Sequence, residues 1–282
     1  MDDALFHRKP LAEQLAKRIM LKAIGSAAPS GIFLAASYGT GKSTFIAEDL
    51  LPQLHALGAL VVHADLQGDA GDVGLAISNS IGSALQHQYS RDPSAQGPKG
   101  GEWVNSFCSK IGLGKEITYT TALVALSAKS RKMIVLLIDE AQLIIQAADR
   151  MAIMAGLKAA RDELNSSKHC GLRIVFVGAS RADLAELCTT RHEPFFATPL
   201  VDLPLLGHEF IQWLCNRPSA PGDLQPDEVF DLFRLIGHRP GLLRRAMEAL
   251  HEERLPHSEQ LIHRLADLLA AQADITNSDS GG

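Results

Sequence analysis

The chain has 282 residues, 46% of them hydrophobic, and is therefore long enough to bury one large core or two smaller ones. Its formal net charge of −5 argues against a generally basic surface that coats nucleic acid, although a local basic stripe could still bind phosphates. No apolar run reaches the roughly 20 residues that span a bilayer, and the four cysteines form no CxxC pair, which together favour a soluble protein of the reducing cytoplasm.

A glycine-rich segment follows the first strand that the sequence predicts. Apolar spacing predicts a helix over residues 11–24, and the apolar run at 32–35 predicts a buried strand. The next residues, SYGTGKST, complete the phosphate-loop pattern GxxxxGK[ST] except that Ala36 stands at the first glycine. A chance lysine after a glycine turn is the weaker reading, because the strand before and the helix after are the context that confirms such a loop. The predicted phosphate-binding residues are Ser37, Tyr38, Gly39, Thr40, Gly41, Lys42, Ser43 and Thr44.

The residue types in this segment suit a bound polyphosphate. Gly39 and Gly41 can adopt positive φ and let the backbone approach phosphates closely. Successive N–H groups then point into one concavity, to which a helix beginning near Lys42 adds the positive end of its dipole. Lys42 is expected to bridge the β- and γ-phosphates, and the Ser43 hydroxyl to take one position around Mg²⁺.

Strands and helices continue to alternate after this segment. A helix is predicted over 45–57, with Pro52 as a place where it could kink. A strand over 59–64 and a helix over 73–85 come next. The stretch at about 89–101 is rich in Pro, Gly and Ser, which predicts a flexible surface insertion.

An acidic pair ends the next strand. A helix over 118–128 leads to the continuous apolar run at 133–138, as expected of a strand covered on both faces. Asp139, which follows directly, would hold Mg²⁺, and Glu140 would accept a proton from the attacking water. Alone this pattern is weak, since a strand end with a solvated acid looks the same. A phosphate loop about a hundred residues upstream makes it a strong sign of nucleotide hydrolysis.

A polar residue, Ser180, follows the next predicted strand. This strand, over 172–177, comes after a helix over 147–164. The carboxyl edge of an open α/β sheet is where ligands bind, so the Ser180 hydroxyl is expected either to orient water or γ-phosphate or to cap a helix over 182–188. The two roles are equally supported. A fifth strand is predicted over 197–203, and from residue 207 only helical periodicity remains, which predicts a second, all-helical domain.

These motifs, in this order, resemble those of the AAA+ ATPases. The most similar groups are the bacterial branch near the origin-recognition type and the transposon-encoded target-selector ATPases. The resemblance covers nearly the whole chain and implies an α/β P-loop NTPase domain over 1–204, a three-layer sandwich around a parallel central sheet. It further implies a small all-helical lid domain over 205–273, followed by a disordered tail over 274–282. ATP would be held between the domains, and a neighbouring subunit would complete the activity.

Individual residues take roles from this resemblance. Lys42 and Ser43 match the Walker A motif. Asp139 and Glu140 match the Walker B motif, and Ser180 falls at the sensor 1 place.

Two arginines also match family positions. Arg191 falls where such proteins often carry an arginine finger, which reaches into the next subunit's site and in other nucleotide hydrolases contributes about 10³- to 10⁵-fold in rate. A solvated loop arginine is the alternative. The sequence GHRPGLLRR resembles sensor 2, but Gly241 stands where arginine is frequent, so Arg244, one helical turn further, is the candidate to bind nucleotide. Near the amino terminus, Phe6 to Arg8 resemble a short box that packs on adenine.

Three functions are compatible with the motifs. The leading one is a slow, Mg²⁺-dependent ATPase that a protein partner stimulates. Its nucleotide state would control its assembly into a homo-oligomeric ring or filament. The same state would control its engagement of duplex DNA, as in transposition target selection. A nucleotide-gated DNA scaffold is the second, with phosphate contacts from Arg131, Lys132 and Lys168. The third is a signalling or antiphage-defence switch that acts through a separate effector. A small-molecule kinase ranks last, because it does not explain the helical C-terminal domain. None of these functions requires a membrane.

Overall fold

The structure is a computed structural model. It describes residues 5–21, 31–67, 72–89, 118–166, 168–217, 220, 224–253 and 262–271. The insertion predicted at 89–101 lies outside the described residues apart from Tyr89, and the tail predicted at 274–282 lies outside them entirely.

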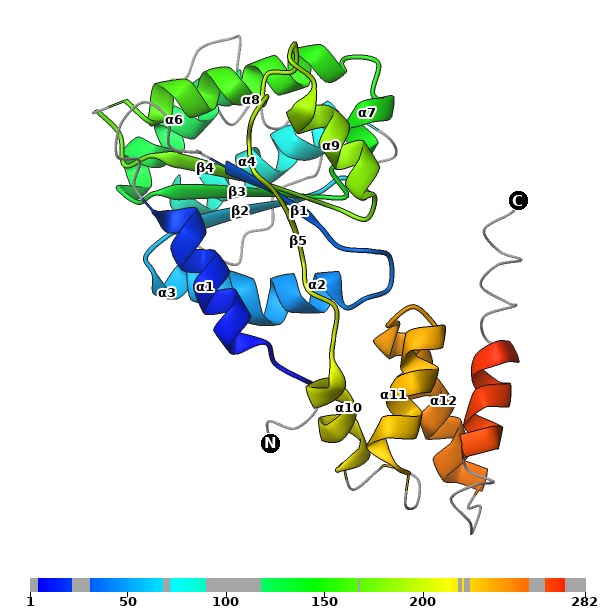
Figure 1. Cartoon of the computed structure of the whole chain (residues 1–282). Helices are drawn as coiled ribbons and strands as arrows, with labels where there is room; N and C mark the ends of the chain where they lie inside the picture. The colour runs from blue at the N-terminus through cyan, green and yellow to red at the C-terminus, as the bar shows by residue number, and fades with distance from the viewer. Residues whose placement is uncertain are drawn as a thin grey trace. The chain divides into compact units, whose positions relative to one another are not determined.

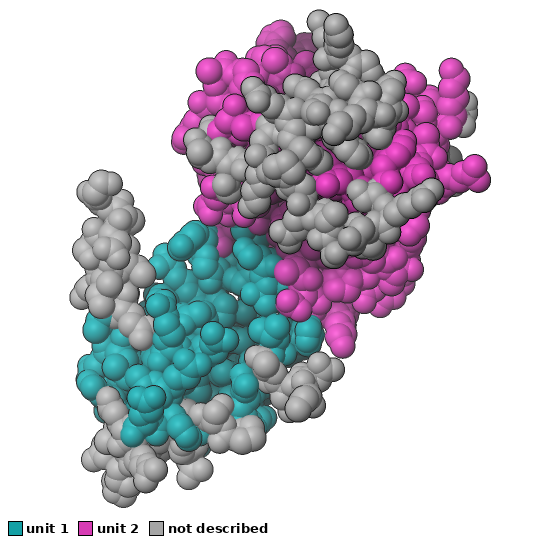
Figure 2. Space-filling view, turned by 180° about the vertical axis from the view of Figure 1, so that it is seen from behind, with its two compact units in different colours: residues 1–8, 38–45, 204–282 teal, residues 9–37, 46–203 magenta. Residues whose placement is uncertain are grey.

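The chain divides into two compact units, coloured separately in Figure 2. The helical unit consists of Met1–Arg8, Tyr38–Phe45 and Pro204–Gly282. The α/β unit consists of Lys9–Ser37 and Ile46–Leu203. The division into domains at residue 204 stays a prediction.

The α/β unit is built on a five-stranded sheet in which all strands are parallel, in the order β2-β3-β4-β1-β5. Every residue of β3 and β4 is buried, as their mainly apolar sequences predict, and the buried residues include the charged Arg173 in β4 and Asp139 at the end of β3. Because the strands are parallel, the residues that end β1, β2, β3 and β4 lie at one edge, where Ala35 pairs with Gly178 and Asp65 pairs with Asp139. The strands are β1 (Gly31–Ala35), β2 (Leu60–Asp65), β3 (Ile134–Asp139), β4 (Leu172–Gly178) and β5 (Leu200–Asp202).

Helices cover both faces of this sheet, which gives the three predicted layers (Figure 1). Helices α1 and α3 pack together on one face, and α4, α6, α8 and α9 cover the other. The α/β fold class with a parallel central sheet is therefore confirmed. The helices are α1 (Lys9–Met20), α3 (Leu51–Ala56), α4 (Val73–Tyr89), α6 (Tyr119–Ser130), α7 (Leu143–Gln146), α8 (Arg150–Leu164) and α9 (Arg181–Thr189).

The helix after the glycine-rich loop is less regular than the sequence predicts. It begins with α2 (Lys42–Thr44), continues as a π-helical stretch, η1 (Phe45–Leu50), and returns to α-helix in α3. Pro52 lies in the first turn of α3, where its missing N–H is tolerated. The predicted kink is thus replaced by a π-helical segment that ends just before the proline. Such segments are frequent at functional sites.

The helical unit has its own hydrophobic core, formed by α10 (His208–Cys215), α11 (Pro226–Leu235), α12 (Pro240–Glu253) and a helical segment over 262–271. Phe233, Leu243 and Leu250 are fully buried in it. The change to an all-helical C-terminal part is as predicted. None of the described helices is long and apolar enough to cross a membrane.

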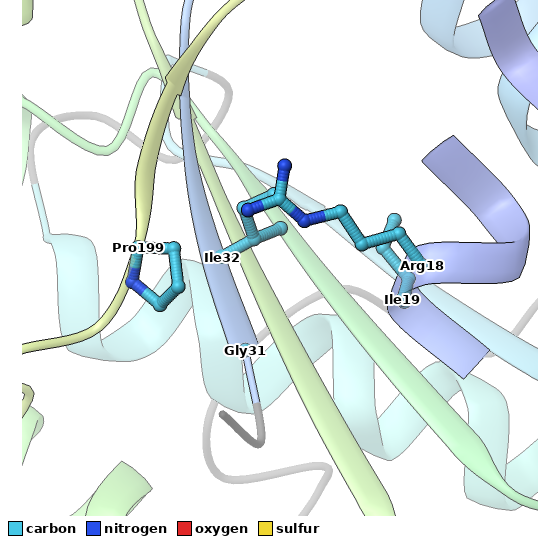
Figure 3. A pocket seen from close by; sticks show the side chains of 5 residues that line it. All are labelled: Arg18, Ile19, Gly31, Ile32 and Pro199. Carbon is cyan, nitrogen blue, oxygen red and sulfur yellow. The ribbon is translucent and has the colours of Figure 1, made fainter. Parts of the chain in front are cut away.

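A small pocket lies at the start of β1, the end of that strand opposite to the glycine-rich loop. Its lining residues are Arg18, Ile19, Gly31, Ile32 and Pro199. Figure 3 shows the Arg18 side chain reaching from α1 toward Ile32. The volume of the pocket, about 20 Å³, is enough for about one water molecule. This pocket is therefore too small for a nucleotide.

Candidate functional site

The glycine-rich loop adopts the backbone conformation that its sequence predicts. Gly39 has φ of 75° and Gly41 has φ of 88°, values that residues with side chains rarely adopt. Gly41 is the residue that caps α2, so a helix begins at Lys42 as predicted. The Lys42 side chain is buried, whereas Ser43 is exposed. The loop thus presents turned backbone, a helix start and an exposed hydroxyl together.

Arg239 packs against this loop within the helical unit. A methyl group added at Gly39 would lie 3.5 Å from Arg239 Cγ, and one at Gly41 would lie 3.7 Å from Pro240 Cγ. Arg239 is the residue just before α12, and sequence reasoning missed it. Its position directly before Pro240, in the sensor 2-like sequence, is the signal that could have identified it.

The predicted alternative, Arg244, lies one turn along α12 from Pro240. Its side chain is 55% exposed, and its Nε lies 3.5 Å from Glu248 Oε1. The Arg239 side chain therefore lies next to Gly39 of the loop, whereas Arg244 is paired within its own helix.

The amino-terminal segment is anchored on the helical unit. The Phe6 ring lies 5.5 Å from that of Phe210 and 5.6 Å from that of Trp213. The Arg8 guanidinium lies 5.1 Å from the centre of the Phe45 ring and donates a hydrogen bond to the Pro204 carbonyl. These contacts place Arg8 against the residue that follows the loop helix α2. Packing on adenine stays a prediction.

The acidic pair lies at the carboxyl end of β3. Asp139 is 7% exposed, and its Oδ1 accepts a hydrogen bond from the Glu140 N–H at 2.8 Å. Glu140 has φ of 56°, in the left-handed region that residues other than glycine seldom adopt. Such backbone strain is concentrated at functional sites.

Ser180 lies beside this pair, at the end of the neighbouring strand β4. Its Oγ accepts a hydrogen bond from the Asp183 N–H at 3.2 Å, so Ser180 caps α9. The capping role is observed, and the role in orienting water or phosphate stays a prediction. Gln142, which sequence reasoning missed, hydrogen-bonds both Glu140 and the backbone of Ala179. The structure therefore joins the acidic pair to the segment that carries Ser180.

Arg191 is exposed on a loop that is firmly held at other points. Within this loop Glu193 is buried and accepts a hydrogen bond from the Arg150 guanidinium, and Phe195 is also buried. The hydrogen bond that Arg150 donates to Glu186 is the main cause that raises the pKa of Arg150, and the hydrogen bond to Glu193 adds to it. Burial of the guanidinium lowers this pKa in part. The role of Arg191 as an arginine finger stays a prediction.

The described residues suit magnesium held mainly by phosphate and water. No group of three or more His, Cys, Asp or Glu residues in the described part of the chain could hold a metal alone. Mg²⁺ bound with nucleotides typically takes one or two protein oxygens and fills its remaining positions with phosphate and water. The Asp139 carboxylate of the α/β unit and the Ser43 hydroxyl of the helical unit are each a donor of this kind.

Solved structures share this fold. No protein-family model and no curated protein matches the chain. The Orc2 protein of Aeropyrum pernix, solved as ADPNP-ADP complexes, superposes with a TM-score of 0.59 and 13% identity over 94% of this chain. The Walker-type ATPase PABY2304 of Pyrococcus abyssi superposes with a TM-score of 0.58 and 15% identity over 99% of this chain. A. pernix Orc1 in complex with DNA superposes with a TM-score of 0.53 and 18% identity over 94% of this chain. The chain shares its fold with these three proteins, as the resemblance to the AAA+ ATPases implies.

These identities are low, so the likeness concerns the fold. The chain spans 76% of PABY2304, 68% of Orc2 and 66% of Orc1, or about two thirds of the length of the origin-recognition proteins. The sequence-based resemblance to the origin-recognition type is thus confirmed at the level of architecture.

Proposed function

We propose that the chain binds ATP with Mg²⁺ and hydrolyses the nucleotide to ADP and phosphate. The observation that carries this proposal is the loop conformation, in which Gly39 and Gly41 both have positive φ directly before a helix that begins at Lys42. Successive backbone N–H groups and a helix start in this arrangement bind phosphates. The fold shared with a Walker-type ATPase and with Orc2 solved with ADPNP and ADP supports it.

Each motif residue has one task in this proposal. Lys42 binds the β- and γ-phosphates, and Ser43 with Asp139 holds the magnesium ion. The bound ion neutralises charge on the phosphate oxygens. Glu140 accepts the proton of the attacking water.

The nucleotide state is proposed to control assembly and the engagement of duplex DNA or a protein partner. Arg191 supports self-assembly, because an exposed arginine on an anchored loop can complete the site of a second copy. DNA engagement is supported by the likeness to Orc1, which was solved with DNA, and by exposed Arg131, Lys132 and Lys168 on the turns that precede β3 and β4. Transposition target selection is one role that such a complex would serve.

We expect Lys42→Ala to weaken ATP binding by about tenfold or more, because a contact with a charged group contributes about 1.5–3 kcal/mol. Titration with a fluorescent ATP analogue measures the affinity, and phosphate release measures turnover. Lys158→Ala removes an exposed lysine on α8 and serves as the matched control, with unchanged binding expected. Equal ATP affinity of wild type and Lys42→Ala would contradict the proposal.

We also expect Arg239 to contribute more to nucleotide binding than Arg244. Arg239→Ala removes a cation whose stem lies against Gly39 and should weaken ATP binding by about tenfold, the effect of one charge-assisted contact. Arg244→Ala breaks an exposed pair with Glu248, which contributes little. The same titration compares the two variants. The reverse ranking would return the sensor 2 role to Arg244.

A further inference from the structure

The side-chain amide of Gln142 connects the ends of two neighbouring strands. Its Nε2 donates a hydrogen bond to Glu140 Oε2, and its Oε1 accepts one from the Ala179 N–H at 3.2 Å. The first partner follows β3 and the second follows β4. Both polar ends of the amide are therefore in use, one on each strand end.

The end of β4 is shaped to receive this amide. A methyl group added at Gly178 would lie 2.4 Å from Gln142 Oε1, closer than non-bonded atoms approach. Only a residue without a side chain leaves this space at position 178. The φ of Gly178 does not fall in the left-handed region that Gly39 and Gly41 occupy. Glycine is therefore needed at position 178 to leave room for the Gln142 side chain, and not for its backbone conformation.

The backbone around Glu140 is pinned at the same place. The Ala141 N–H donates to the Val177 carbonyl at 2.8 Å, and the Glu140 carbonyl accepts from the Leu143 N–H at 2.9 Å. Together with the left-handed φ of Glu140, these bonds fix where its side chain leaves the chain. The Gln142 amide then acts on the carboxylate at the far end of that side chain.

We propose that Gln142 is a positioning residue, whose amide holds the Glu140 carboxylate in place relative to the Gly178–Ala179 end of β4. The inference rests on the proposed function of Glu140 as the proton acceptor. A base must lie within hydrogen-bond reach of the water it activates, and a displacement of about 1 Å can cost 10²-fold in rate. Gln142 supplies a fixed donor to one carboxylate oxygen without competing for a proton.

Gln142→Glu is the most informative variant, because it preserves size and the acceptor for the Ala179 N–H. It replaces the amide donor with an oxygen that repels the Glu140 carboxylate. We expect kcat to fall about ten- to hundredfold, with ATP affinity within about twofold of wild type and little change in Tm. Gln142→Ala should lower kcat by a similar factor. Gln146→Ala, which alters an exposed glutamine at the end of α7, the helix that Gln142 precedes, is the matched control.

Gly178→Ala tests the contact from the other strand. The added methyl group would lie 2.4 Å from Gln142 Oε1 and would displace the amide, and it would also lie 3.1 Å from Leu184 Cδ2, so the Tm of this variant is measured as well. Because Gly178→Ala and Gln142→Ala break the same contact, their effects on kcat should be less than additive in the double variant.

The outcomes separate this inference from the proposed function. One outcome would overturn the role of Gln142 alone. In it, wild type turns ATP over and Glu140→Gln does not, but kcat of Gln142→Glu and of Gln142→Ala stays close to that of wild type. Higher kcat in either variant would also overturn it, since the amide would then restrain the carboxylate. A wild-type protein that binds ATP without turning it over would overturn both.

Discussion

Replacing Glu140 with glutamine is expected to leave ATP bound and to lower turnover by about 10²- to 10⁴-fold, the usual contribution of a positioned general base. The substitution changes few contacts. The Gln142 Nε2–H that now donates to Glu140 can donate to an amide oxygen instead. The loss should therefore appear in kcat, measured by phosphate release, and ATP affinity should stay within about twofold.

The same variant shows whether bound ATP drives assembly. Since hydrolysis is blocked, any ATP-dependent oligomer accumulates, and light scattering with and without duplex DNA measures its size. Glu228→Gln, an exposed glutamate on α11, controls for the loss of one surface charge. Turnover of Glu140→Gln equal to that of wild type would remove Glu140 from the mechanism and leave the phosphate loop as a binding element only.

The sheet was predictable because its strands are buried on both faces. Every residue of β3 and β4 is buried, and apart from Arg173 and the terminal Asp139 the two strands are runs of apolar residues and glycine that differ from any amphipathic pattern. Turn chemistry was equally readable. Gly39 and Gly41 are glycines because their φ values are positive, which a sequence pattern can report without knowledge of tertiary structure.

Contacts between strand ends were not predictable in the same way. That Gln142 meets Ala179 depends on β3 and β4 being neighbours, whereas the chain alone does not state the strand order. Arg239 meets Gly39 through the fold of the loop before α12. The sequence pointed to Arg244 because this residue lies one helical turn after Gly241, the position where arginine is frequent. For Gln142 only three-dimensional proximity gives the contact, whereas the position of Arg239 directly before Pro240 was a sequence signal.

The fifth strand shows a different limit. An apolar stretch predicted β5 over 197–203, but the strand covers only Leu200–Asp202. Ala197 has φ of 63°, and its N–H donates to the Cys188 carbonyl at 2.8 Å, so the preceding residues form a turn at α9. The residues lost from the strand belong to the anchored loop that presents Arg191. Local apolar content could not reveal that they serve this loop.

Replacing Arg191 with alanine is expected to lower turnover by about 10³-fold or more, as loss of an arginine finger does in other nucleotide hydrolases, without weakening ATP binding by its own subunit. Arg191→Lys should rescue little, because lysine lacks the planar pair of donors. Phosphate release measures the loss. Arg234→Ala, an exposed arginine on α11 paired with Asp231 at 3.6 Å, is the control and should retain full turnover.

Mixing two inactive proteins decides whether Arg191 acts in its own site or in a neighbour's. In a head-to-tail assembly, Arg191→Ala subunits supply Glu140 and Glu140→Gln subunits supply Arg191, so about a quarter of the sites in an equal mixture are complete. We expect turnover to recover to about that fraction of wild type. A finger that acted within its own subunit would give no recovery, since every site would lack one of the two residues. Recovery that requires ATP-dependent assembly would therefore establish that each site is shared between two copies of the chain.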